Sequence, residues 1–303
     1  ADRTEPSAAQ IRDGQPPTLA TTPPSPAQTR WAAIVTFGLL AAFVITLPFG
    51  AVRLPQSYLF APIVQTGIFI IDLVTAVLLY AQFSIVRSRG LLVLAGGCVF
   101  TAFIMIPYTD AILRLFVDAV PTAAKLNLPA WLYLFWHAGL PLSVIGYVWL
   151  NTRAGEQPVS HARVRWAIAT SVAVSLLAVC ALSWIASAGY LPTIMAYATL
   201  ARSPVVFVVP ALLSASAAVI LWRYQRSVLD LWLLVMLWTW LVDILLQIVP
   251  VLVERFSVGY YSGRIYGLLS TTIILAVLLV DATTLNARLV IFAMARRLCK
   301  RYR

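Results

Sequence analysis

Four ionisable side chains lie within long apolar stretches of this sequence: Asp72, His137, Asp243 and Arg264. A titratable group is costly where it faces lipid, so it normally faces the interior of a helical bundle or a wet cavity and often marks a site. Together, such carboxylates, an imidazole and a guanidinium can bind a small polar ligand, an ion or a proton. The alternative is that they only satisfy one another, Asp243 with Arg264 and Asp72 with His137, and hold helices together.

Polar residues near two of these groups recur at helical spacing. Tyr133 and His137 are four residues apart, and Thr239, Asp243 and Gln247 follow one another at steps of four. Residues at this spacing lie on one face of an α-helix. Because a polar face on an apolar helix points away from lipid, we expect both sets to face the interior of a bundle.

A third polar face lies on the stretch 59–86, through residues seven, three and seven positions apart: Gln65, Asp72, Thr75 and Gln82. With about 1.5 Å of rise per residue, His137 and Asp243 are expected roughly 10 Å below the outer surface and Asp72 near the midplane. Arg264 enters at the outer end of its helix. We therefore predict a ligand pocket that opens outward, formed by six candidate residues: Asp72, Tyr133, His137, Asp243, Gln247 and Arg264.

No pattern typical of an enzyme accompanies these residues. The sequence has no HExxH, Walker loop, GxSxG or ordered Ser/His/Asp set, so we expect no catalytic activity in this chain. One histidine and two carboxylates are possible metal ligands, but no spacing within a single helix supports a metal site. Cys98, Cys180 and Cys299 have no CxxC spacing, which argues against a disulfide framework or a zinc site. Which cofactor, if any, the chain binds is unknown from the sequence.

Composition determines the fold class. Hydrophobic residues make up 61% of the chain and charged residues 11%, and the mean hydropathy is +0.88. These values predict an all-α integral membrane protein, a bundle of eight transmembrane helices in a lipid bilayer. The predicted spans are 31–52, 59–86, 91–107, 130–150, 165–188, 204–222, 229–250 and 264–281.

Three segments follow from these spans. Residues 1–29 are rich in Pro, Ala, Thr, Ser and Gln and are expected to form a disordered tail. Residues 30–283 form the transmembrane domain, and residues 284–303 form a basic helix that leads to an output domain or a partner. Of the 22 Lys and Arg residues, 16 fall on the side of the two termini, which predicts that both termini are cytoplasmic. The net charge of +11 is therefore a topology signal and does not indicate nucleic-acid binding.

Two features concern packing between the spans. Pro141 and Pro210 lie within predicted spans, so we expect kinks there and carbonyl groups that need other partners in the bundle. Gly263 and Gly267 form a GxxxG pattern where the last span begins, which permits close approach of another helix.

The last span is expected to continue as a helix into the cytoplasm, because no Pro or Gly interrupts residues 283–303. Leu285, Leu289 and Phe292 lie at alternating steps of four and three, which favours a homodimer along this helix. The basic residues that follow instead favour an anchor on anionic lipid, at about 1 kcal/mol each. Both can hold at once.

Three segments carry a family resemblance: DLVTAVLLYAQFSIVRSRGLLVLA (72–95), AWLYLFWHAGLPLSVIGY (130–147) and SVGYYSGRIYGLLSTTIILAVLL (257–279). Over residues 31–290 the chain resembles the bacterial membrane-associated sensor domain of the fourth MASE class. The resemblance implies a multi-span sensory module of the bacterial inner membrane, usually fused to a diguanylate cyclase or a histidine kinase. The family tends to have a Pro-His pair after the third span, where this chain has Pro107 and Tyr108.

We therefore expect a sensory membrane module that detects a ligand or a membrane state through the outward pocket and relays it through its last helix. A transporter or channel for a small molecule or ion is the first alternative, and it requires an inner opening connected to the outer pocket. A structural subunit of a larger membrane complex is the second.

Overall fold

The computed structural model describes residues 18–117, 123–153, 158–194, 205–253 and 256–301, without the side chains of 115–117, 123–126, 248–253 and 284–301. In the described chain, eight helices are long and apolar enough to cross a membrane. They are α2 (Pro26–Thr46), α3 (Phe60–Val86), α4 (Arg89–Val117), α5 (Ala123–Thr152), α6 (Val164–Ser187), α7 (Val205–Tyr224), α8 (Val228–Val253) and α9 (Val258–Arg301). The predicted all-α class and the eight spans are confirmed.

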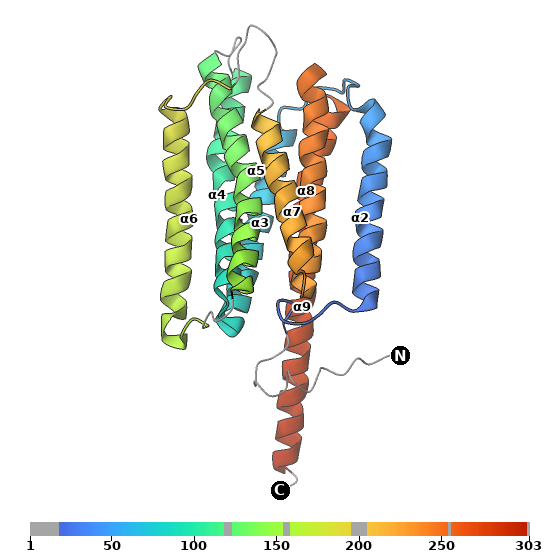
Figure 1. Cartoon of the computed structure of the whole chain (residues 1–303), viewed down its shortest axis with the longest axis vertical. Helices are drawn as coiled ribbons and strands as arrows, with labels where there is room; N and C mark the ends of the chain where they lie inside the picture. The colour runs from blue at the N-terminus through green and yellow to red at the C-terminus, as the bar shows by residue number, and fades with distance from the viewer. Residues whose placement is uncertain (1–17, 118–122, 154–157, 195–204, 254–255, 302–303) are drawn as a thin grey trace.

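Six of these helices form a closed ring in which each packs against the next: α3, α4, α5, α7, α8 and α9, with α9 against α3 again. Outside the ring, α6 packs on α4 and α5, and α2 packs mainly on α8. Figure 1 shows α6 and α2 at opposite edges of the bundle. Only 11% of the α6 span and 6% of the α2 span are buried, against 72% for α8. The protein interior therefore belongs to the six ring helices.

The predicted disordered tail of residues 1–29 is wrong for residues 18–29. Helix α2 begins inside this range with a capping box, in which Ser25 accepts from the Gln28 backbone and Gln28 accepts from the Ser25 backbone. Before the helix, the carbonyl groups of Leu19 and Thr22 accept hydrogen bonds from backbone N–H groups at the start of α8, at 3.1 and 2.9 Å. These bonds satisfy donors that a helix start leaves free, and they hold a segment whose composition alone predicts no structure.

Prolines are accommodated inside the helices. Helix α4 continues through Pro107 to Val117, although we predicted that this span ends at Pro107. In α5, Pro141 has no N–H to bond the carbonyl group of His137, four residues earlier. Trp240 of α8 donates its Nε1–H to that carbonyl oxygen at 3.4 Å. The predicted need for an outside partner is thus confirmed at Pro141.

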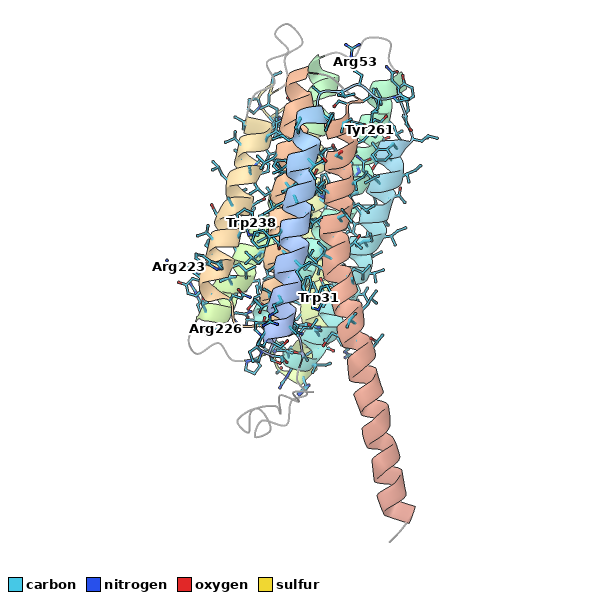
Figure 2. The ribbon with its side chains drawn as sticks, turned by 90° about the vertical axis from the view of Figure 1, so that its right-hand side faces the viewer. Trp31, Arg53, Arg223, Arg226, Trp238 and Tyr261 are labelled. Atoms are coloured by element: carbon cyan, nitrogen blue, oxygen red, sulfur yellow. The ribbon has the colours of Figure 1, made fainter. Side chains whose placement is uncertain are left out.

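Helix α9 is the longest element. It has 44 residues, which at 1.5 Å per residue is about 66 Å, and Figure 1 shows it projecting beyond the bundle. The predicted continuous last helix is confirmed. We call the end from which α9 projects the exit end and the opposite end the far end. Figure 2 shows Trp31, Arg223 and Arg226 toward the exit end, and Arg53 and Tyr261 toward the far end.

Candidate functional site

A polar contact crosses the middle of the ring between two helices that are not next to each other in it. His137 of α5 places its Nε2 atom 3.2 Å from Oδ2 of Asp243 on α8. Both side chains are 0% exposed. Within the described residues, Asp243 forms no ion pair with Arg264 and Asp72 forms none with His137. The contact that forms is therefore neither of the two pairings that the sequence suggested.

The surroundings of His137 fix the number of protons that the pair holds. Its Nδ1 atom lies 3.0 Å from the carbonyl oxygen of Tyr133, and a carbonyl can only accept, so Nδ1 carries a proton. A second proton must lie between Nε2 and the Asp243 carboxyl group, either on the imidazole or on the acid. In both forms the pair is neutral overall, which makes its burial tolerable. Loss of that proton leaves a negative charge in the core.

The other side of the Asp243 carboxyl group meets Gln247 and helix α9. Gln247 donates its Nε2–H to Oδ1 at 2.6 Å. A Cβ atom added to Gly267 would lie 3.0 Å from Oδ2, and one added to Gly263 would lie 3.2 Å from Oδ1. The two glycines of the GxxxG pattern therefore let α9 pass directly over this carboxyl group.

Aromatic rings surround His137. The ring centroids of Tyr133, Trp136 and Trp240 lie 3.9, 4.0 and 5.1 Å from the imidazole centroid. The ring centroid of Tyr108 on α4 lies 5.8 Å from that of Trp136. These rings exclude water from the pair, so its electrostatic interactions are stronger than they would be near solvent.

Three buried polar atoms beside the pair have no hydrogen-bond partner among the described residues: Tyr133 Oη, Trp136 Nε1 and Arg264 Nε. Leaving a buried donor unpaired costs about 1–3 kcal/mol. The indole and guanidinium groups can only donate, and the phenol can also donate. We call Tyr133, Trp136 and Arg264 the donor cluster, and it is suited to an acceptor from a ligand or from water.

Arg264 is held at the far-end side of this cluster by Tyr260. Its guanidinium carbon lies 3.8 Å from the centroid of the Tyr260 ring, and Nη1 donates to the Tyr260 carbonyl oxygen at 3.2 Å. Its charge also interacts with Tyr133. The structure therefore brings five of the six candidates into one region, namely Tyr133, His137, Asp243, Gln247 and Arg264.

The sixth candidate, Asp72, belongs to a different contact. It is 4% exposed and interacts with Thr101 of α4, and its Oδ2 atom has no partner among the described residues. On the same face of α3, Gln65 accepts from Thr109 of α4 at 2.9 Å, and Gln82 donates to Asp281 of α9 at 3.0 Å. The predicted inward face of α3 is confirmed, and it ties α3 to both of its ring neighbours.

Two predictions about the site concern its opening and metal binding. The predicted outward opening depends on loops that include residues 118–122 and 195–204, which lie outside the described residues. In the described part of the chain, no three His, Cys, Asp or Glu side chains come together as metal ligands.

Comparison with known families gives one match. A family model described as a membrane-associated sensor, integral membrane domain (MASE4), matches residues 55–286. The chain belongs to this family. Comparisons with curated proteins and with solved structures find no match.

The extent of the MASE4 match follows the architecture. It runs from the start of α3 to the end of the membrane-spanning part of α9, so it contains the six ring helices and α6. Helix α2 lies outside both the matched residues and the ring. The His137–Asp243 pair and the donor cluster lie within the match, as expected of features that belong to the sensor domain.

A second polar region of this MASE4 domain lies at the exit end and was not predicted. Tyr147 donates its hydroxyl to Oδ1 of Asp230 at 2.6 Å, and Oδ2 accepts from the backbone N–H groups of Arg226 and Ser227, both at 2.9 Å. The Ser227 hydroxyl in turn accepts from the Asp230 backbone. This reciprocal cap starts α8, and Ser-x-x-Asp before an apolar run was the signal that would have found it. A cavity of about 270 Å³ lies beside it.

Proposed function

We propose that this membrane-associated sensor domain detects an acceptor-bearing ligand at the donor cluster, and that the His137–Asp243 pair passes the event to α9. The observation that carries the proposal is the contact between Asp243 and the two glycines of α9, with Gly267 placed so that a Cβ would be 3.0 Å from Oδ2. The helix that leaves the membrane thus rests on the carboxyl group at the centre of the ring.

The chemistry of the donor cluster defines the ligand class. Three buried donors with no partner among the described residues favour a ligand that presents carbonyl, carboxylate or similar oxygens. A ligand bound there would contact Tyr133, whose carbonyl oxygen holds Nδ1 of His137 at 3.0 Å. Binding would thereby change the position or the proton of the pair, and with it the charge that α9 covers.

The relay follows from close packing. Packed interfaces switch between discrete arrangements instead of deforming continuously. A Cβ atom added at Gly267 or Gly263 would lie only 3.0 or 3.2 Å from the Asp243 carboxyl oxygens, so α9 packs closely over this group, and in this proposal a displaced carboxyl group makes α9 shift. Helix α9 is continuous from Val258 to Arg301, so a shift at the far end reaches the exit end.

We take the exit end as cytoplasmic, in line with the distribution of basic residues. In this proposal, α9 pairs with α9 of a second copy through Leu285, Leu289 and Phe292, and the basic residues after them lie on anionic lipid. The output is a diguanylate cyclase or a histidine kinase, fused or separate, controlled by the shift of the paired helices.

Transport is less well supported by the packing. Four apolar side chains lie between the His137–Asp243 pair and the exit-end cavity: Leu140 and Val144 of α5, and Leu233 and Leu237 of α8. Each is at most 5% exposed. These four side chains form an apolar layer between the two polar regions along α5 and α8. A transporter would have to open it, whereas a sensor uses it as a rigid connection.

Disulfide trapping across α9 in native membranes tests the proposal. Single cysteines at positions 285, 289, 292, 287 and 290 are introduced after Cys98, Cys180 and Cys299 are replaced by alanine. We expect efficient cross-linking at 285, 289 and 292 and poor cross-linking at 287 and 290, and we expect His137→Gln to change this pattern. The control Ser216→Ala, at an exposed position of α7, should leave it unchanged.

Two outcomes would contradict the proposal in different ways. Equal cross-linking at all five positions would rule out the helix pairing. A clear pattern that His137→Gln and Asp243→Asn leave unaltered would keep the pairing but reduce the buried pair to a structural role.

A further inference from the structure

We propose that the exit-end cavity binds a phosphate-bearing anion, either the headgroup of an anionic phospholipid or free phosphate. The cavity holds about 270 Å³, just below the roughly 300–1,000 Å³ of pockets for drug-sized ligands. Its walls come from the α3–α4 turn, the ends of α5 and α7, the start of α8 and the segment before α2. Nothing in the proposed far-end site depends on it.

The polar lining of this cavity is rich in donors. Asn151, Tyr224 and Arg226 line it with groups that can donate to a ligand, whereas the Thr152 hydroxyl already donates to the Val148 carbonyl oxygen at 2.9 Å. Ser88 donates to the amide oxygen of Asn151 at 2.7 Å, which leaves the amide NH₂ of Asn151 to donate. Phosphate oxygens are strong acceptors that hydroxyl, amide and guanidinium groups recognise.

One negative and one positive side chain line the cavity, Asp230 and Arg226, and they differ in whether the protein already pairs them. The Asp230 carboxylate already accepts three hydrogen bonds, from Tyr147 and from two backbone N–H groups of its own cap. Arg226 lines the same cavity and is exposed, and none of the carboxylates in the described residues pairs with its guanidinium group. The available charge is therefore positive, and it calls for an anion.

The level of the cavity in the membrane favours a lipid headgroup as the source of the phosphate. Trp149 and Trp222 lie near the exit ends of α5 and α7 and are 52% and 67% exposed, and Tyr224, which lines the cavity, is 48% exposed. Exposed Trp and Tyr at helix ends mark the depth of the headgroups. Basic pockets between helices at this depth are typical binding sites for anionic headgroups.

Such an anion would add a connection between the elements that meet at this cavity, namely the segment before α2, the end of α5 and the turn between α7 and α8. The segment before α2 contributes Ala20 and Thr21 to the cavity, and its neighbours Leu19 and Thr22 hold the start of α8. A phosphate group between Arg226 and Asn151 would tie α5 to the α7–α8 turn at the end where α9 leaves the ring.

The test compares lipid retention by the full chain and three variants with native mass spectrometry. The protein in detergent micelles is titrated with phosphatidylglycerol or phosphatidylcholine, with and without added inorganic phosphate. Arg226→Gln removes the charge at the cavity, and Arg226→Lys keeps it. Arg223→Gln is the matched control, because Arg223 is also exposed, is three residues away and does not line the cavity. Figure 2 shows its side chain pointing away from the bundle.

We expect one phosphatidylglycerol to be retained in preference to phosphatidylcholine, and its retention to fall about tenfold in Arg226→Gln, the loss of one charge-assisted hydrogen bond. Arg226→Lys and Arg223→Gln should keep most of it. Displacement by inorganic phosphate would support the site with free phosphate as its ligand, and resistance to phosphate would support it with a lipid ligand. Equal loss in Arg226→Gln and Arg223→Gln, or equal retention of both lipids, would overturn the proposal.

Discussion

The substitution Gly267→Ala, which adds one methyl group, tests how closely α9 packs on the buried His137–Asp243 pair. The new Cβ would lie 3.0 Å from Oδ2 and 3.5 Å from Cγ of Asp243, so the carboxyl group or the helix must move by a few tenths of an ångström. Overpacking of this kind costs about 1–3 kcal/mol. Replacing Gly by Ala within a helix returns about 0.5–1 kcal/mol. We expect Gly267→Ala to lower the free energy of unfolding by about 1 kcal/mol, the centre of a range that ends at about 2.5 kcal/mol.

Two comparisons isolate the contact with Asp243. Gly38 of α2 has nothing within 4 Å of an added Cβ, so Gly38→Ala should be neutral or stabilise by up to about 1 kcal/mol. In an Asp243→Ala background the obstacle is absent, so Gly267→Ala should no longer destabilise. The resulting coupling energy should be about 1–3 kcal/mol.

The free energy of unfolding can be measured by titrating the purified chain in mixed micelles with sodium dodecyl sulfate and following tryptophan fluorescence. If Gly267→Ala behaves like Gly38→Ala, or costs the same with and without the Asp243 carboxyl group, then α9 does not rest on Asp243. The packing argument for the relay would then fail.

Three further predictions use the same unfolding assay. Trp240→Phe removes the donor to the His137 carbonyl oxygen and should lower the free energy of unfolding by about 1 kcal/mol. In a Pro141→Ala background the loss should be smaller, because alanine at this position has a backbone N–H that can bond to the same oxygen. Tyr147→Phe leaves Oδ1 of Asp230 without its 2.6 Å donor and should cost about 1–3 kcal/mol, whereas equal stability would mean that water replaces the hydroxyl. Deleting residues 1–22 removes two acceptors from the start of α8 and should cost about 2 kcal/mol; no loss would show that the segment contributes nothing to stability.

The polar faces could be predicted from sequence, but the partners across helices could not. Helical spacing placed His137 and Asp243 on inward faces, and both are 0% exposed. Which inward face meets which depends on the order of helices around the ring, and α5 and α8 are separated in it by α7. Spacing along one helix contains no information about that order, so it could not show that His137 meets Asp243 instead of forming the alternative pairs Asp243–Arg264 and Asp72–His137.

Two further parts of the polar regions could not be predicted from the sequence: the tryptophans around His137 and the N-terminal segment at the exit-end cavity. Trp136 and Trp240 read as ordinary apolar residues of a span, and only the freed carbonyl group beside Pro141 gives Trp240 a specific role. The exit-end cavity depends on Ala20 and Thr21, which lie in a segment whose composition predicts disorder. That segment is held by bonds to the start of α8, which local composition does not reveal.

The relay from Asp243 to the end of α9 is tested most directly by an intramolecular distance. Spin labels are placed at position 223 of α7 and at Cys299 of α9, with the other two cysteines replaced by alanine, and the labelled chain is diluted with unlabelled chain in nanodiscs. Pulsed electron paramagnetic resonance should show that Asp243→Asn shifts the distance by about 1–5 Å, while Ser216→Ala leaves it unchanged. A distribution that is the same for the wild-type chain and for Asp243→Asn would contradict the relay.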